Sequence, residues 1–382
     1  MGFALSPMQI TSAAFEPLGR IPKKHTGEGT NVSPPLSWSG APKETKSFVL
    51  VVHDPDAPLA TPDGYGFVHW LLYNIPASVT SLAEGEAGYT SGATGFIGSA
   101  VVRDLIAGGQ QVIGLCRSEH KAATLSAAGA EVHLGSLQDL DSLEHGIARA
   151  DGVIHLAFNH DFSTFVANCE DDRRVIEALG AALIGSDRPL IVTSGTPIAN
   201  TVPGQPAKED NPTVRSNEHP RAASEEAATA VAARGANVSV VRLPQVHDAT
   251  RQGLVTPTIQ MYRAKGVCAY IGDGRNRWPA AHVLDVARVY RLAIEKAKPN
   301  AKYHAVAEEG VPMRAIAEAV SRRLRLPAKS IAPEEAPAIF GWLATFAAHD
   351  MPASSAQTRS KLGWTPTGPG LIADLEQLQA PR

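Results

Sequence analysis

A glycine-rich turn between residues 91 and 98 is the segment of the sequence best suited to bind a ligand. Its letters, SGATGFIG, place Gly92, Gly95 and Gly98 directly before an apolar helical pattern. One glycine permits the tight turn, a second lets the backbone approach a pyrophosphate, and a third lets helix and strand pack closely. Amide N–H groups at the start of the helix then face the anion. The spacing therefore predicts a dinucleotide site.

Short apolar runs alternating with longer helical patterns must position this turn. Strands joined by crossover helices at such intervals predict an α/β fold, a doubly wound parallel sheet of the Rossmann type. Beyond residue 250 the pattern is mostly helical, which predicts a small C-terminal lobe. The expected helices span 96–109, 120–128, 137–149 with Ser136 as N-cap, 165–184 and 222–233, and the expected strands span 111–116, 131–135, 152–158, 189–195 and 237–246.

The first strand of this sheet is the weak point of the pattern. A central strand buried on both faces should be a nearly continuous apolar run. Residues 83–91 read AEGEAGYTS, with two glutamates and no branched aliphatic residue. Either a poor strand is tolerated here, or the sheet lacks its usual edge against the ligand.

Several segments in order carry a family resemblance. They are GATGFIGSAVVRDLIAGG, DGVIHLAF, VTSGT, RLPQVHD and SKLGWTP, and the resemblance that they carry covers nearly all of residues 92–380. Together they resemble the short-chain dehydrogenase/reductase superfamily, in an atypical form of its NAD-dependent epimerase/dehydratase branch. The resemblance implies that Gly92, Thr94, Gly95, Phe96, Ile97 and Gly98 cradle the pyrophosphate, that Ala157 lies along the nicotinamide ribose, and that Leu243, Pro244 and Gln245 line the nicotinamide end.

The choice between NAD and NADP depends on the charge of the side chains that directly follow the second strand. A carboxylate there would bond the ribose 2′-OH of NAD, whereas an arginine suits the 2′-phosphate of NADP. The sequence offers Arg117, with Lys121 nearby, which favours NADP. Glu119 leaves NAD open, and Arg117 also fits a plain strand end at the surface.

The catalytic pattern of the superfamily is incomplete. None of the seven tyrosines has a lysine four residues later, and Arg221 and Glu225 occupy the positions of that pair. The resemblance expects a substrate-binding hydroxyl at Ser194 and Thr196. His160 is the most natural replacement proton donor, because imidazole titrates near neutrality; a capping or solvent-facing role is the alternative.

Arg221 has two interpretations of its own. Its guanidinium could bind an anionic substrate through two hydrogen bonds. The favoured interpretation is a surface ion pair with Glu225 at i,i+4. His155 lies inside a strand and is expected to be a satisfied core residue.

Residues 1–88 have a different character from the rest of the chain. Ten of the 28 prolines fall before residue 91, between the β-type runs SFVLVVHD and FVHWLLYNI. The segments IPKKHTGEGTNVSPPLSWSG, HDPDAP and FVHWLLYNIP resemble bacterial phosphatidylethanolamine-binding proteins. That resemblance implies an anion pocket near Asp54, Asp56 and His69, in a domain about half the family's length. Because half a β-sandwich exposes strand edges, the segment must dock on the second half, pair with another chain or be poorly ordered. A fused or mispredicted gene would produce such a segment, and this origin is favoured over a bifunctional design.

The composition narrows the classes of partner. Thirty-five basic and 38 acidic residues give a net charge of −3, which excludes a general attraction to nucleic acid. The longest uncharged apolar run, 336–348, is too short to span a bilayer, and the N-terminus lacks a signal-peptide pattern, so a cytoplasmic location and small-molecule partners are expected. The three cysteines are expected to be buried thiols rather than metal ligands.

Three functions stay open from the sequence. Residues 89–250 are expected to bind the nucleotide and residues 251–382 the substrate, in an NADP-dependent oxidoreductase or epimerase. The missing Tyr-x-x-x-Lys pair favours, alternatively, a nucleotide-binding sensor or scaffold without turnover. The third is an N-terminal module for anions or lipid headgroups. Members of the family that the chain resembles often dimerise, so the oligomeric state stays open and includes a homodimer.

Overall fold

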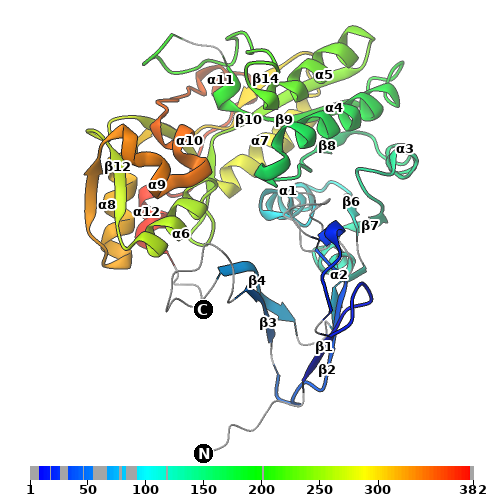
Figure 1. The fold of residues 1–382 in the computed structure, drawn as a ribbon. Helices are drawn as coiled ribbons and strands as arrows, with labels where there is room; N and C mark the ends of the chain where they lie inside the picture. The colour runs from blue at the N-terminus through cyan, green and yellow to red at the C-terminus, as the bar shows by residue number, and fades with distance from the viewer. Residues whose placement is uncertain are drawn as a thin grey trace, which may run out of the picture. The chain divides into compact units, whose positions relative to one another are not determined.

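The chain divides into two compact units, Met1–Tyr89 and Thr90–Arg382. Figure 1 shows the computed structural model of the protein. The structure describes residues 8–17, 19–25, 33–45, 47–54, 67–76, 80–82, 93–117, 119–199 and 202–378.

The first unit consists of short antiparallel strands. Strands β1 (Gln9–Thr11), β2 (Leu36–Ser39) and β5 (Ser81–Leu82) form a sheet in the order β1-β2-β5. Strands β3 (Ser47–Asp54) and β4 (Phe67–Pro76) form a separate antiparallel pair, and a 3-10 turn covers Lys23–His25. Alternate residues Leu36 and Trp38 of β2 are buried, as one-sided strands require. The two β-type runs are thus confirmed as paired strands.

The second unit is built on parallel strands. Four of them, β8 (Val153–His155), β9 (Pro189–Gly195), β10 (Asn237–Leu243) and β14 (Lys302–His304), lie in the order β14-β10-β9-β8. Strands β6 (Ile113–Cys116) and β7 (Glu131–Leu134) form a second parallel pair. Within the described ranges, no strand links β6 to β8. Residues 83–92, which hold the expected first strand, lie outside those ranges.

Helices connect these strands as the sequence predicts. They are α1 (Phe96–Ala107), α2 (Glu119–Ala127), α3 (Leu140–Ile147), α4 (Phe165–Ala181), α5 (Ala223–Ala233) and α7 (Val283–Lys296). Gly109 follows α1 with φ +86°, a conformation that glycine adopts without strain.

Several predicted boundaries were wrong. The expected strand 152–158 is only the three-residue strand β8. Helix α3 begins at Leu140, and its N-cap is Asp139 rather than Ser136, because the Asp139 carboxylate accepts a bond of 3.0 Å from the N–H of Ser142. The expected strand 237–246 is interrupted at Pro244, which has no N–H to donate to a sheet. The chain continues as a separate strand, β11 (Gln245–His247).

The four-stranded sheet is covered on both faces, as a parallel sheet requires. Leu190 and Val192 of β9 pack into an apolar cluster with α4 and α5, whereas Ile191 packs into a cluster with α1 and α7. Helices α4 and α5 lie side by side (Figure 1). A Cβ at Gly180 of α4 would come within 2.6 Å of the Val231 side chain, so this helix contact depends on glycine.

The C-terminal lobe contains more strand than the sequence predicts. Its helices are α6 (Val255–Lys265), α8 (Met313–Leu324), α9 (Ala336–Phe340), α10 (Ala344–Ala348), α11 (Ala356–Leu362) and α12 (Leu371–Glu376), with 3-10 turns η5 (Pro333–Glu335) and η6 (Gly341–Leu343). Strand β11 joins β13 (Arg277–His282) and β15 (Glu308–Pro312), and β12 (Cys268–Ile271) pairs with β16 (Ala328–Ile331). The expectation of a mostly helical lobe was therefore incomplete.

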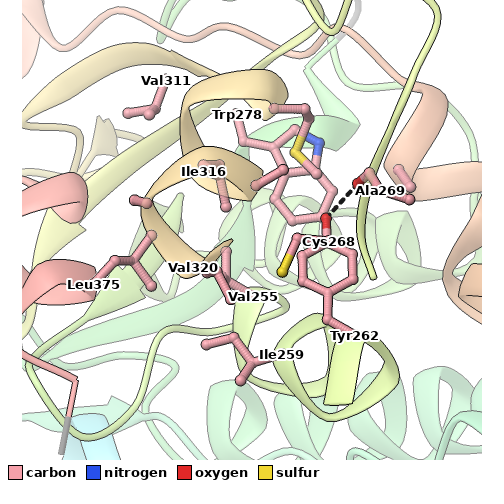
Figure 2. Packing of buried hydrophobic residues seen from close by; sticks show 14 of the residues in the cluster. Val255, Ile259, Tyr262, Cys268, Ala269, Trp278, Val311, Ile316, Val320 and Leu375 are labelled. Atoms are coloured by element: carbon pink, nitrogen blue, oxygen red, sulfur yellow. Dashed lines mark hydrogen bonds between the residues drawn. The ribbon is translucent and has the colours of Figure 1, made fainter. Parts of the chain in front are cut away.

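A dense apolar core holds this lobe together. Figure 2 shows Trp278, Tyr262 and Cys268 packed against Ile316 and its neighbours. The Tyr262 hydroxyl donates to the carbonyl of Ala269 at 2.5 Å, which satisfies a polar atom in an otherwise apolar setting. Burial raises the pKa of Tyr262 well above its usual range, so this phenol stays neutral and structural.

The last helix is fastened to the rest of this unit by a buried polar contact. Nδ1 of His247, at the end of β11, lies 2.6 Å from Oδ2 of Asp374 in α12. Leu371 and Leu375 of the same helix are buried in the lobe core. Desolvation lowers the pKa of His247, although Asp374 opposes this, so the imidazole is neutral at pH 7.

None of the helices in the described ranges has the length and apolar character that a bilayer crossing requires.

Candidate functional site

The start of α1 presents bare backbone N–H groups. Gly95 is its N-cap in an extended conformation, without a capping side-chain bond, and its first turn contains no acidic residue. The first N–H groups of a helix lack partners inside the helix, and they carry the positive end of its dipole. Thr94, Phe96, Ile97 and the buried Gly98 belong to the same turn. Gly92 lies outside the described residues.

The carboxyl ends of the parallel strands meet at one edge. In the pairing of β9 with β10, Ser194 lies opposite Arg242 and Gly195 opposite Leu243. The Thr196 hydroxyl lies 3.4 Å from the carbonyl of Leu243. The register therefore brings Ser194, Thr196 and Leu243 together.

The other sequence-predicted residues lie at strand ends. Ala157 follows β8 and is half-buried, Arg117 follows β6 and is exposed, and Pro244 joins β10 to β11. Gln245 is buried, and its amide oxygen accepts a bond of 2.9 Å from the N–H of Leu254. Part of the hydrogen-bonding capacity of Gln245 is thus used within the fold.

Ser194 is buried with an unused hydroxyl. Its side chain is 3% exposed, and Oγ has no hydrogen-bond partner among the described residues. The neighbouring Thr193 hydroxyl donates to the carbonyl of His155 and meets the hydroxyl of Tyr290 in α7. Because side chains alternate along a strand, Ser194 faces the opposite side, where α4 and α5 pack.

Arg221 occupies this same side of the sheet. It lies in the 3-10 turn η4 (Pro220–Ala222), and its Nη1 donates to Oδ2 of Asp172 in α4 at 2.7 Å. Its Nη2 donates to the carbonyl of Thr193 at 3.0 Å, and its guanidinium lies 4.1 Å from the ring centroid of Phe158. The expected ion pair of Arg221 with Glu225 was wrong, because tertiary partners outcompete the neighbour on the helix.

Asp172 collects bonds from three elements. Nε2 of His155 donates to it at 2.7 Å, and Ser224 donates to it as well as contacting Arg221. Burial alone would raise the pKa of Asp172, but Arg221, His155 and Ser224 outweigh burial and lower it. His155, Asp172, Arg221 and Ser224 form a cluster that we name the Arg221 cluster. His155 is a satisfied core residue, as predicted.

Asp172 was missed by sequence reasoning. It lies in the helical run FVANCEDDRRVIEALGA among several exposed charges. The spacing of Cys169, Asp172, Val175 and Ile176 places them on one face of the helix, and all four are buried. A lone carboxylate on an apolar helical face was therefore the available signal.

Glu225 has a different partner. Its carboxylate accepts two bonds from the fully buried Arg242, at 2.7 and 2.8 Å, and one from Thr213 at 2.8 Å. Burial would raise the pKa of Glu225, but Arg242, Lys302 and Thr213 lower it to about 2. Arg242 Nη1 also meets Nε2 of His304 at 3.2 Å. We name Thr213, Glu225, Arg242, Lys302 and His304 the Arg242 cluster.

His160 follows β8 among aromatic rings. Its Nδ1 lies 3.1 Å from the carbonyl of Phe158, and the two ring centroids are 5.1 Å apart. Desolvation by these neighbours and the charge of Arg221 lower the pKa of His160. The imidazole is therefore neutral at pH 7.

The described part of the chain contains no group of three His, Cys, Asp or Glu side chains able to hold a metal ion. Cys116, Cys169 and Cys268 are buried thiols. Burial raises the pKa of Cys169 and of Cys268 to about 11.

The residues expected for the N-terminal anion pocket are only partly described. Asp54 ends β3 opposite Phe67, two residues before His69 in β4. Asp56 lies outside the described residues.

Comparison with known proteins identifies the larger unit. Residues 89–307 match the profile of the NAD dependent epimerase/dehydratase family. The chain belongs to the NAD-dependent epimerase/dehydratase family. It is 45% identical over 290 residues to protein C2A9.02 of Schizosaccharomyces pombe and 38% identical over 290 residues to YLL056C of Saccharomyces cerevisiae. Each match covers 75% of this chain and 97% of the relative.

Solved structures of other proteins share the fold of the larger unit. DesIV, a dTDP-glucose 4,6-dehydratase from Streptomyces venezuelae solved with NAD and TYD bound, has a TM-score of 0.61 at 18% identity, covering 75% of this chain and 94% of that one. MoeE5, solved with UDP-glucose and NAD, has a TM-score of 0.58 at 20% identity, covering 75% and 95%. At such identities the likeness establishes the fold alone, and the predicted Rossmann-type fold is confirmed.

The N-terminal part of the chain, including the first residues of the second unit, matches a second profile. Residues 11–108 match the phosphatidylethanolamine-binding protein family, so the predicted resemblance is confirmed. A UPF0098 protein of Chlamydia trachomatis is 47% identical over 78 residues, which cover 20% of this chain and 52% of that protein. The segment thus spans about half the length of these relatives.

Proposed function

We propose that residues 90–382 form an oxidoreductase or epimerase that uses NADP and acts on a small carbonyl compound or alcohol. The observation that carries this proposal is the start of α1, where a glycine N-cap, no capping side chain and no first-turn acid leave N–H groups available to an anion. This arrangement fits a pyrophosphate, and family membership supports the same ligand.

The residues assigned to the nucleotide follow the edge of the sheet. Gly92, Thr94, Gly95, Phe96, Ile97 and Gly98 would hold the pyrophosphate, Ala157 the ribose, and Leu243, Pro244 and Gln245 the nicotinamide end. When bound, the nicotinamide supplies or accepts a hydride. Gln245 is held by its bond to Leu254, so its remaining N–H groups keep a fixed direction.

Arg117 supports a preference for NADP over NAD. It is exposed directly after β6, the second strand of the family's sheet, where a 2′-phosphate would meet a guanidinium. A carboxylate at this position would instead favour the 2′-OH of NAD.

Ser194 would orient the substrate oxygen. A buried hydroxyl without a partner is costly unless a ligand satisfies it, so Ser194 is free to bond a carbonyl or alcohol oxygen. Thr196 follows at the same edge and would assist, because its contact with the Leu243 carbonyl is long, at 3.4 Å.

His160 would handle the proton in place of the missing tyrosine. The Phe158 carbonyl can only accept, so Nδ1 of His160 carries the hydrogen and Nε2 is the basic atom. Because its pKa is lowered, Nε2 accepts a proton during alcohol oxidation at pH 7. In the reverse direction water supplies the proton unless the solution is acidic.

Gly95→Asp tests the proposal. An aspartate caps a helix well, so folding is preserved, but its charge repels a pyrophosphate. We expect NADPH affinity to fall about 100-fold by calorimetry, whereas Gly95→Ser, which caps without charge, loses much less. Wild-type protein should bind NADPH more tightly than NADH. Equal NADPH affinity in the Gly95→Asp variant and the parent would refute the assigned site.

A nucleotide-binding sensor without turnover is the second candidate. It is favoured by one observation: Arg221 and Glu225, which occupy the positions of the usual tyrosine and lysine, are both neutralised by internal ion pairs. Enhanced NADPH fluorescence without consumption across a panel of carbonyl compounds would support this role over catalysis.

A further inference from the structure

A continuous set of aromatic rings borders the edge where Ser194 lies. It comprises Phe158, His160, Phe162, Phe165, His219 and Trp342, which we name the ring network. Phe162 stacks on Trp342 with centroids 4.3 Å apart and planes at 20°, and on Phe165 at 5.5 Å and 24°. Phe165 meets Phe158 at 6.2 Å and His219 at 6.5 Å. The network therefore joins the end of β8 to the C-terminal lobe.

The ring network runs from the interior to the solvent. Phe158 is 5% exposed and lies under Arg221, whereas Trp342 of η6 is 46% exposed. Phe162 lies between them in η2 (Phe162–Thr164) and is half-buried. An indole exposed in this way and stacked on a phenyl ring is an accessible apolar surface for a flat ligand.

The network carries little net charge. Burial and the neighbouring charge of Arg221 lower the pKa of both His160 and His219, and His349 lowers that of His219 further. The cation that contacts the rings, Arg221, is already paired with Asp172. A diphosphate brought to these rings would find no uncommitted positive charge among them, and its desolvation would be uncompensated.

Two buried polar atoms, one in the ring network and one at the carboxyl end of β9, lack partners among the described residues. These are Oγ of Ser194 and Nδ1 of His219, for which the described residues provide no hydrogen bond. Ser194 is bonded through the chain to Thr193, whose carbonyl holds Arg221 against Phe158. A ligand with one polar oxygen on a flat aromatic body would satisfy the Ser194 hydroxyl while its rings cover the network.

We propose that this site takes an aryl carbonyl compound, or the corresponding aryl alcohol, rather than a nucleotide sugar. The inference rests on the proposed function and specifies its substrate class. Reduction would place the hydride on the carbonyl carbon and a proton on the oxygen, giving the alcohol, and NADPH would become NADP.

Direct binding to the full-length chain tests the substrate class. With NADP present, so that no reduction occurs, 2-acetylnaphthalene and UDP-glucose are titrated separately by calorimetry. We expect 2-acetylnaphthalene to bind and UDP-glucose to bind at least 10-fold more weakly. Tighter binding of UDP-glucose, or no binding of 2-acetylnaphthalene, would overturn the inference.

Variants locate the ligand on the ring network. Trp342→Leu and Phe162→Leu should each weaken binding of 2-acetylnaphthalene about 3- to 10-fold, because aromatic contacts of this kind are lost. Trp342→Phe keeps a ring and should restore most of the affinity. Leu284→Ala, at a position 59% exposed on α7, is the matched control and should change nothing. Unchanged binding in both leucine variants would contradict the inference.

The same samples separate the two proposals. If NADP binds but 2-acetylnaphthalene does not, the substrate class is wrong and the proposed function stands. If NADP does not bind, the proposed function fails, and binding of 2-acetylnaphthalene without nucleotide still decides whether the rings form an aryl site.

Discussion

The Arg221 and Arg242 clusters each pair an arginine with a buried carboxylate, but they differ in how completely the arginine is buried. Arg242 is fully buried and holds Glu225 through two bonds, with Thr213 and His304 completing its shell. The Arg221 side chain is 15% exposed, is stacked on Phe158, and donates to the carbonyl of Thr193. The next residue, Ser194, has a hydroxyl without a partner among the described residues. The closed Arg242 cluster is expected to act on stability alone, whereas the function proposed above places the more open Arg221 cluster beside the substrate.

The largest difference should appear in stability. Arg242→Met leaves the Glu225 carboxylate buried without its main partner, so we expect the free energy of unfolding to fall by about 3–5 kcal/mol. Arg221→Met should cost less, about 1–3 kcal/mol, because Asp172 keeps His155 and Ser224. Urea titrations of both variants, followed by circular dichroism, measure this. Equal losses would contradict the distinction between the clusters.

Lowering the pH should reduce the stability that the Arg242 cluster provides. Arg242 donates toward Nε2 of His304, and burial together with this cation lowers the pKa of His304 to about 4, from 6.5. The unfolded state therefore takes up a proton between pH 6.5 and 4 while the folded state does not, so stability falls as the pH falls. Glu225, with its pKa of about 2 against 4.5, extends the loss further into acid.

We expect protonation linked to His304 and to Glu225 to lower the free energy of unfolding by about 3 kcal/mol each. Urea midpoints measured from pH 7 to 3 test the first step, which His304→Gln should flatten. An acid response that is identical in this variant and the parent would exclude His304 as its source.

A smaller effect, confined to activity, is expected at Ser194, which directly follows the Thr193 carbonyl bound by Arg221. Ser194→Ala should lower kcat about 100-fold on a substrate that the enzyme turns over, since a group that bonds the reacting oxygen is removed. Unfolding free energy should be unchanged, because Oγ has no partner in the described structure. Ser239→Ala is a close control: its hydroxyl on β10 is also buried and unpartnered, but it lies well before the carboxyl end of the strand.

The nucleotide-binding half of the fold could be predicted because its signals are local. Apolar runs such as PLIVTSG specify β9, and the glycines after α1 mark its end. The strands of the C-terminal lobe could not be predicted in the same way. RWPAAH and EEGVP show no alternation of apolar and polar residues. They become strands by pairing with each other, although the paired residues are 28 to 35 positions apart in the chain.

The candidate site was predictable only in its outline. Strand ends placed Ser194, Thr196 and His160 at one edge, because carboxyl ends of parallel strands coincide. The partners of Arg221 and Glu225 were not accessible, since Asp172 and Arg242 come from elements 49 and 17 residues away. Spacing along a helix predicts ion pairs between neighbours on that helix. In the folded chain, residues from other elements form the ion pairs instead.

The contact between His247 and Asp374 makes the end of the chain part of the interior. A frameshift or proteolytic cut just before Leu371 would strip three leucines, Leu371, Leu375 and Leu378, from the lobe core and leave His247 without its carboxylate. Such a product would be expected to aggregate rather than persist as a shortened enzyme. Affinity tags and fusion partners therefore belong beyond Leu378 and should not replace the helix that precedes it.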